Sequence, residues 1–302
     1  MSMMPNRLLL IIGLMGGGVF LSGCHLAGHD GPISPSLARC REYSQQGVLA
    51  LEQGRWASAE LLLRKAVESC PDDPEARRHL AEALWYQGRK QEALVQLDQA
   101  IALVPNDGEL RVRATEMRLG VNQIEPARHE IETALNLEPN RADAWAMRAR
   151  VLRAAKDPRG ALADYHRALG YAPNDRDLLM ETAELYAELN EPEQALALLH
   201  SLIDGCGPGE EPQKALYLEG LAYAALGRND EAAESYATAL ARGAPTPELL
   251  YQLALVQSHA GRPREAVVAA EAALRLAPTH GPSRQLIERL NVAQCPDPTI
   301  HR

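Results

Sequence analysis

Residues 74–107 read PEARRHLAEALWYQGRKQEALVQLDQAIALVPND, and this stretch contains the pattern that decides the fold. Small residues stand at Ala81, Ala93 and Ala100, and Pro105 follows near the end. Along the chain the pattern occurs seven times at a step of 34 residues, with one slip of three residues before the sixth copy. A period this constant predicts a solenoid of stacked units rather than one globule.

Each unit is predicted to be a hairpin of two helices, because small residues recur where two helices would touch. Small side chains let the helix axes approach closely, and larger residues between them fill the remaining space. One column of small residues holds Ala59, Ala93, Ala127, Ala161, Ala195, Ala232 and Ala266, and another holds Gly47, Ala81, Thr115, Ala149, Ala183, Gly220 and Ala254. The larger residues are Leu63, Leu97, Ile131, Tyr165, Leu199 and Tyr236.

The turn between the two helices of each unit has its own signature. One position holds mostly residues that tolerate a left-handed backbone, which ends a helix. These residues are Gly54, Gly88, Asn122, Lys156, Asn190, Gly227 and Gly261. Proline often follows within the first turn of the next helix, where its missing N–H costs little.

Together these columns resemble the tetratricopeptide repeat, and the second unit shows the likeness well. Its matching residues are Leu80, Ala81, Leu84, Gly88, Ala93, Leu97, Ala100 and Pro105. The resemblance implies an all-α fold, an α-solenoid in which about seven helical hairpins form a right-handed superhelix. Residues 281–291 carry apolar side chains on one side and polar ones on the other, and we expect them to form a C-terminal capping helix.

These observations divide the chain as follows. The solenoid is expected to occupy residues 37–291, and a C-terminal tail follows at 292–302. Within the solenoid, repeats are expected near 40–73, 74–107, 108–141, 142–175, 176–212, 213–246 and 247–280.

The N-terminal segment 1–23 is interpreted as a signal peptide, because an apolar stretch follows Arg7 and ends in Leu21-Ser22-Gly23-Cys24. This ending resembles a bacterial lipobox, which implies that Cys24 becomes the lipidated first residue and that residues 24–36 form a flexible tether. Lipid chains on Cys24 would anchor the protein to a membrane. His25 is not the aspartate that marks inner-membrane retention, which favours the periplasmic face of the outer membrane. An uncleaved anchor and simple secretion are the alternatives.

Charge and composition exclude some classes of partner. Without residues 1–23, which contain Arg7, the chain has 30 basic and 40 acidic residues. This acidic balance gives no electrostatic basis for binding nucleic acid. The partner predicted from the repeats is therefore a protein or a peptide.

The cysteines suggest one disulfide, since an exported protein meets an oxidising compartment. Cys40 opens the first helix of the first repeat and Cys70 closes its second helix, so antiparallel packing brings them together. We predict a Cys40–Cys70 disulfide, with two reduced thiols as the alternative. No bond is expected between Cys206 and Cys295.

No motif in the sequence supports catalysis or a cofactor. There is no Cys-x-x-Cys pair, no phosphate-binding loop, no dinucleotide fingerprint and no nucleophile elbow. We expect no catalytic residues, no metal site and no cofactor, and therefore no enzyme.

In proteins that this chain resembles, the first helix of each hairpin lines a concave groove where partner segments bind. Aromatic, methionine and arginine side chains are enriched at binding hot spots, although aromatic residues in a solenoid can also fill gaps between hairpins. The candidate partner-binding residues are Arg78, Trp85, Tyr86, Arg113, Met147, Arg150, Arg153, Met180, Tyr217, Leu221 and Tyr251.

The function predicted from the sequence is that of a lipid-anchored scaffold or adaptor of the bacterial envelope, which binds partner segments in its groove. Two other roles remain open. The chain could be a non-catalytic subunit of an envelope enzyme or of a secretion or pilus assembly complex, or a structural protein that associates with itself.

Overall fold

The computed structural model describes residues 35–294, which form fifteen α-helices and no strand. The signal peptide, Cys24 and Cys295 lie outside the described residues. The helices are α1 (Pro35–Glu52), α2 (Trp56–Ser69), α3 (Pro74–Tyr86), α4 (Lys90–Leu103), α5 (Gly108–Leu119), α6 (Ile124–Leu137), α7 (Ala142–Ala154), α8 (Pro158–Tyr171), α9 (Arg176–Glu188), α10 (Pro192–Asp204), α11 (Gln213–Ala225), α12 (Asn229–Arg242), α13 (Pro247–His259), α14 (Pro263–Leu276) and α15 (Gly281–Gln294).

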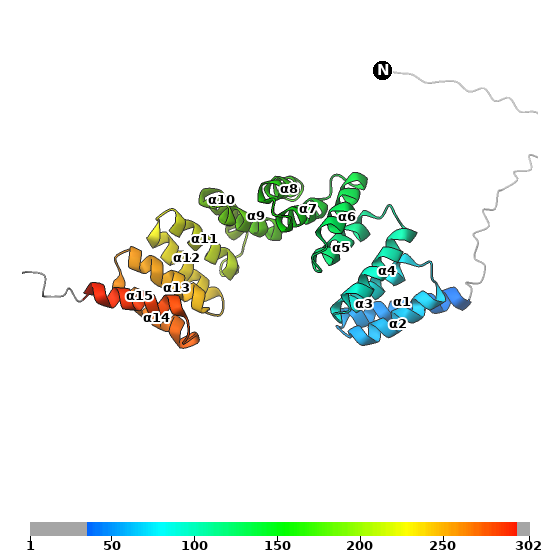
Figure 1. Ribbon diagram of the computed structural model, residues 1–302, viewed down its shortest axis with the longest axis horizontal. Coiled ribbons are helices and arrows are strands. Elements are labelled where there is room, and N and C mark those ends of the chain that lie inside the picture. Colours follow the sequence, from blue (N-terminus) through cyan, green and yellow to red (C-terminus); the bar gives the residue numbers. More distant parts are fainter. Residues whose placement is uncertain (1–34, 295–302) are drawn as a thin grey trace, which may run out of the picture.

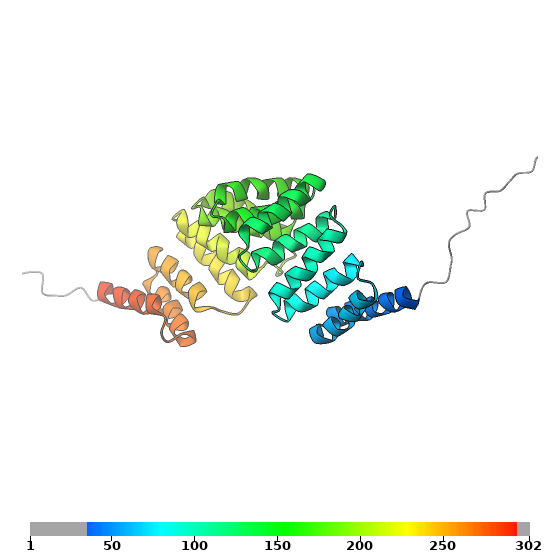
Figure 2. The ribbon, with the colours of Figure 1, turned by 45° about the vertical axis from the view of Figure 1, so that its right-hand side comes forward.

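Consecutive helices pair into seven hairpins, from α1 with α2 to α13 with α14, and α15 packs on the last of them. The hairpins stack side by side into a curved solenoid that spans the figure as an arch (Figure 1). A view turned by 45° shows the same order of hairpins, with the two ends of the solenoid on opposite sides (Figure 2). The predicted all-α solenoid of seven hairpins and a final helix is confirmed. Within the described residues, no helix is long and apolar enough to span a membrane.

Close contact between the two helices explains the column of small residues. A Cβ atom built on Gly220 of α11 would lie 2.4 Å from Cε1 of Tyr236 on α12. Real Cβ contacts are never this short, so the fully buried tyrosine ring requires glycine opposite it. Gly47 and Leu63 repeat this arrangement in the first hairpin, where the corresponding distance to the leucine Cγ is 2.6 Å.

The turns within the hairpins adopt the left-handed backbone that the sequence predicts. Asn122, Lys156 and Asn190 have φ angles of 60°, 66° and 57°, and the equivalent glycines Gly54, Gly88, Gly227 and Gly261 are also positive. Lysine is costly at this angle, because its Cβ atom crowds the following carbonyl group. Lys156 therefore occupies a place that asparagine or glycine would fill with less strain.

The core is a row of clusters rather than one centre. Alanine and leucine dominate each cluster, and the largest fully buried side chains are Tyr165 and Tyr236. Each cluster joins neighbouring hairpins only, which is the expected arrangement in a solenoid.

Candidate functional site

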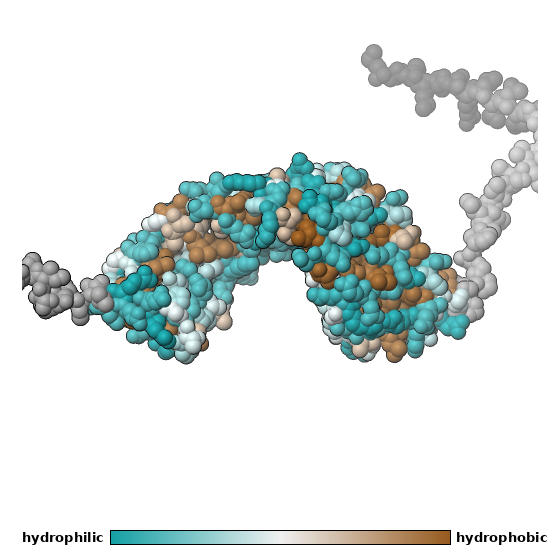
Figure 3. Space-filling view, viewed as in Figure 1, coloured by the Kyte–Doolittle hydropathy of each residue, from teal (hydrophilic) through white to brown (hydrophobic). Residues whose placement is uncertain are grey.

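The hollow side of the arch is the candidate binding surface (Figure 3). First helices of successive hairpins line three hollows there. The largest has a volume of about 890 Å³ and lies among α7, α8, α9 and α11. We call it the central hollow, and its lining residues are Arg150, Arg153, Ala154, Lys156, Pro158, Tyr165, Glu181, Glu184, Glu188 and Lys214.

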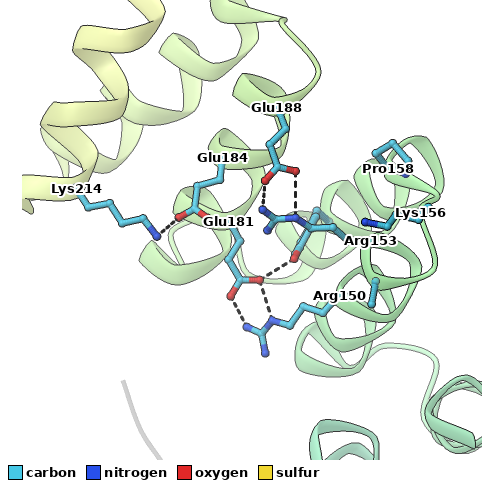
Figure 4. A pocket seen from close by; sticks show the side chains of 10 residues that line it. Arg150, Arg153, Lys156, Pro158, Glu181, Glu184, Glu188 and Lys214 are labelled. Atoms are coloured by element: carbon cyan, nitrogen blue, oxygen red, sulfur yellow. Dashed lines mark hydrogen bonds and ion pairs between the residues drawn. The ribbon is translucent and has the colours of Figure 1, made fainter. Parts of the chain in front are cut away.

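Ion pairs between neighbouring hairpins cross the central hollow (Figure 4). Arg150 on α7 donates from Nε and Nη2 to the two carboxylate oxygens of Glu181 on α9. Arg153 donates in the same way to Glu188, and Lys214 of α11 pairs with Glu184. The hydroxyl of the buried Tyr165 donates to Glu181 Oε2 at 2.7 Å.

These ion pairs hold the helices around the hollow in place, but they leave some N–H groups of the arginines without an acceptor among the described residues. Within residues 35–294, no bond engages Nη1 of Arg150 or Nη1 of Arg153. Lys156 also lines this hollow, and its ammonium forms no ion pair with the side chains drawn in Figure 4. The central hollow can therefore offer N–H donors to an additional acidic group.

A second hollow of about 240 Å³ lies between α3 and α5, and its polar groups are mainly acidic. Arg113 holds the two helices together through both carboxylate oxygens of Glu82 and also pairs with Glu116. Arg78 pairs with Glu75 at 2.6 Å and with Glu109 at 3.9 Å. We call this site the acidic hollow.

A third hollow of about 270 Å³ lies between α11 and α13, and its lining is more apolar. Tyr217 and Leu249 lie there beside Gln213, Lys214, Thr246 and Glu248. Partial burial, with the nearby Glu248 carboxylate, raises the pKa of Tyr217 above its ordinary value. Lys214 lines this hollow and the central hollow, so the two are adjacent. We call this site the apolar hollow.

Five of the candidate residues line these hollows. They are Arg78 and Arg113 in the acidic hollow, Arg150 and Arg153 in the central hollow, and Tyr217 in the apolar hollow. Met180, Leu221 and Tyr251 are half-buried against core clusters near the same surface.

Three other candidates have mainly structural contacts. Met147 is only 5 % exposed and belongs to a core cluster, so its predicted place in the groove is wrong. Trp85 is half-buried against the core, with the Lys90 ammonium 5.1 Å from its ring centre. Tyr86 is exposed, but its ring stacks on Trp56 at a centroid distance of 4.3 Å.

The sequence did not identify the acidic partners of the arginines. The sequence analysis names Arg113, Arg150 and Arg153 as candidate binding residues, whereas in the structure each pairs with a glutamate of a neighbouring first helix. Lys156 and Lys214 were also missed, although both line the central hollow. Among the described residues, no group of three or more His, Cys, Asp and Glu side chains is arranged to hold a metal ion.

The two cysteines of the first hairpin are free thiols in this structure and lie near each other. Burial raises the pKa of the Cys40 thiol to about 12, and the neighbouring Cys70 and Asp73 contribute in the same direction. The Cys40 thiol donates to Asp73 Oδ2 at 3.7 Å. A Cys40–Cys70 disulfide stays a prediction that this proximity favours.

His79 lies beside the acidic hollow, and its buried position predicts that the free energy of unfolding depends on pH. Burial, with the charge of Arg78, holds the pKa of His79 below its ordinary value of 6.5. The unfolded chain therefore takes up this proton at a higher pH than the folded chain, and the free energy of unfolding falls as the pH drops below about 6.5. His79→Gln is expected to remove this contribution in urea denaturation between about pH 7.5 and 5.5.

Substitution of the exposed His129 by glutamine is the matched control. An unchanged slope in His79→Gln would contradict the assignment.

Family models for the tetratricopeptide repeat match most of the chain. One model matches residues 44–108 and 217–280, and a second matches residues 84–151 and 152–204. No curated protein matches the sequence.

Several solved structures have a similar fold. A tetratricopeptide repeat protein from Parabacteroides merdae superposes with a TM-score of 0.60 at 16% identity, over 84% of this chain and 99% of that chain. YrrB, described as a tetratricopeptide repeat protein with an unusual peptide-binding site, gives 0.56 at 19% identity, over 64% of this chain and 97% of its own. Pseudomonas aeruginosa pilF gives 0.53 at 16% identity, over 84% and 99%. At these identities the likeness shows the fold alone.

Proposed function

Because this chain belongs to the tetratricopeptide repeat family, we propose that it is a scaffold of the bacterial envelope that holds a partner protein's segment in its groove. Members of this family generally serve as protein–protein interaction scaffolds. The observation that carries the proposal is that first helices of neighbouring hairpins line two adjacent hollows, the central and the apolar one, which share Lys214.

The ion pairs across the groove support a binding role. Arg113 with Glu82 and Arg150 with Glu181 join successive first helices and hold the surface in one shape. A surface that is already ordered loses little conformational entropy when a partner binds. The central hollow is open rather than enclosed, so a partner would enter it as an extended segment rather than as a small molecule.

The place of action is proposed from the N-terminal sequence. A lipid anchor on Cys24 and the segment 24–36 would hold the solenoid beside the outer membrane, on its periplasmic face. The protein would then act by binding and positioning, without catalysis.

Binding in the groove can be tested by site-specific photo-crosslinking in cells. A crosslinking amino acid at Lys214 lies in the groove, and one at the exposed Val95 lies on a second helix outside the three hollows. We expect a discrete protein product from position 214 and none from position 95. The same products from both positions, or products from position 95 alone, would contradict the proposal.

Crosslinking is preferred to a test in which the charge of Arg150 is reversed. Reversal there would break the pair with Glu181 and could lose a partner through a distorted groove. The mass of the crosslinked partner also distinguishes an envelope enzyme or assembly complex from a second copy of this chain.

The anchor gives a separate prediction. Cells fed an alkynyl fatty acid should label the wild-type chain, and Cys24→Ser should abolish the label and release the protein from the membrane fraction. Cys206→Ser is the control and should remain labelled. Labelling of Cys24→Ser would exclude Cys24 as the lipidated residue.

A further inference from the structure

The character of the groove changes in order along the solenoid. In the first helices α3 to α13, charged or aliphatic residues, alanine or methionine occupy two positions near the groove up to the fifth repeat, and tyrosine and leucine occupy them in the last two. The first position reads Arg78, Val112, Ala146, Met180, Tyr217 and Tyr251, and the second reads Glu82, Glu116, Arg150, Glu184, Leu221 and Leu255.

The acidic hollow at the N-terminal side carries an excess of negative charge. Five carboxylates line it beside only two guanidinium groups, those of Arg78 and Arg113. The side chains of Glu75, Glu109 and Glu116 are more than half exposed to solvent. These carboxylates can accept hydrogen bonds from lysine or arginine side chains of a partner.

The central hollow carries the opposite balance. Four basic side chains line it beside three glutamates, each of which already pairs with a basic group. Two of the four lysines in the whole chain, Lys156 and Lys214, lie there. The basic side chains therefore outnumber the carboxylates in this hollow, although the chain as a whole has a net charge of −9. This local positive charge favours binding of an acidic group.

The apolar hollow follows directly, because Lys214 lines both sites. Tyr217 and Leu249 provide its apolar surface, and the Tyr217 ring lies 5.9 Å from that of the fully buried Tyr236. A half-buried tyrosine supported by a rigid core residue is a favourable contact for an aliphatic or aromatic side chain.

We propose, on the basis of the binding function above, that the groove selects an extended segment carrying basic, acidic and apolar side chains in that order, running from α3 to α13. Neighbouring helices lie about 8–10 Å apart, and an extended chain advances about 3.3 Å per residue. Successive hollows are two first helices apart, about 16–20 Å, so the three groups are spaced by about five or six residues. The apolar hollow lies beyond the central one, so the bound segment continues past the central hollow. The acidic groups that bind there are therefore side chains within the segment and not its terminal carboxylate.

Electrostatics makes this order selective. A segment with its basic and acidic groups exchanged places carboxylates against Glu75 and Glu109, and ammonium groups against Arg150 and Lys156. Like charges juxtaposed in a partly desolvated groove oppose binding and suppress wrong partners.

The probe is a labelled peptide, acetyl-Lys-Lys-(Gly-Ser)₂-Glu-Glu-(Gly-Ser)₂-Leu-Phe-amide, tested by fluorescence anisotropy against the full chain in mild detergent. Two comparison peptides exchange the lysine and glutamate pairs or replace Leu-Phe by Ser-Ser. We expect the matched peptide to bind about tenfold more tightly than the exchanged one, with a preference that weakens as salt is raised. The Ser-Ser peptide should bind more weakly than the matched one.

Lys156→Asn tests the central hollow without loss of stability. Asparagine suits the φ angle of 66° at this turn, so thermal stability should not fall, whereas affinity for the matched peptide should drop about threefold. Lys65→Gln is the matched control, because it removes the same charge from an exposed lysine outside the three hollows and should leave affinity unchanged.

Equal binding of the matched and exchanged peptides, unchanged affinity in Lys156→Asn, or no binding up to about 1 mM would each overturn the inferred order. The photo-crosslink at position 214 reports on the groove independently of any peptide. A crosslinked partner together with a failed peptide preference would leave the proposed function standing and reject only the order of charges. Loss of the crosslink as well would reject both.

Discussion

Replacement of Tyr165 by alanine is expected to lower the free energy of unfolding by about 3–5 kcal/mol. The ring is fully buried in a cluster made mainly of alanine and leucine side chains, and a close-packed core refills such a cavity only in part. The substitution also removes the hydroxyl that donates to Glu181, so it affects the core and the floor of the central hollow together. Urea denaturation followed by circular dichroism measures the change.

Tyr171 on the same helix provides the control. Its side chain is about half exposed, and its hydroxyl donates to Asn140 on the surface. Tyr171→Ala should change the free energy of unfolding by less than about 1 kcal/mol. A loss of that small size in Tyr165→Ala would mean that the ring does not support the core.

Phenylalanine separates the ring from its hydroxyl. Tyr165 and Tyr236 occupy the same position of two repeats and are both fully buried. Within the described residues, the Tyr236 hydroxyl has no hydrogen-bond partner, whereas that of Tyr165 donates to Glu181. Tyr165→Phe should therefore cost about 1–2 kcal/mol, while Tyr236→Phe should be neutral or stabilising, because it removes an unpaired polar group. Equal losses in both variants would contradict this reading.

The repeat period made most of the fold predictable. Each hairpin contacts only its neighbours, so a local pattern of small residues and turn residues determines the whole solenoid. The positive φ angles at Asn122, Lys156 and Asn190 lie at the turn position that the sequence predicts. The slip of three residues lies in the loop between α10 and α11, where Arg242 pairs with Glu211.

The groove was less predictable, because composition alone does not show which charged side chains pair with each other. A signal was nevertheless present. Glu82 with Arg113, and Arg150 with Glu181, are each separated by 31 residues. This spacing is one repeat less about one helical turn, which places the two residues side by side on consecutive first helices. Opposite charges at this spacing indicate a structural pair rather than a free binding group.

Met147 shows the other limit of the sequence. Methionine is enriched at binding surfaces, but it also fills irregular gaps in cores. Its side chain belongs to the cluster between the third and fourth hairpins, together with Ile131 and Val151. Residue type therefore did not determine its exposure, which depends on how the hairpins stack.

Oxidation of Cys40 and Cys70 to a disulfide is expected to stabilise the first hairpin by about 3–4 kcal/mol in the chain-entropy model, since the bond closes a loop of about 30 residues. Protein isolated from an oxidising compartment should resist alkylation at both cysteines until a reductant is added. Burial raises the pKa of Cys40 and so disfavours its thiolate at neutral pH.

The stabilisation should be concentrated at the N-terminal end of the solenoid. Leu49 of α1 is 53 % exposed, whereas its equivalents Ala83, Met117 and Val151 are fully buried against a preceding hairpin. The first hairpin lacks such a neighbour and is therefore the one most prone to open. Hydrogen exchange should slow in α1 and α2 on oxidation, with little change in α13 and α14. Cys70→Ser should lose this difference and Cys206→Ser should keep it, while equal exchange in oxidised and reduced protein would contradict the bond.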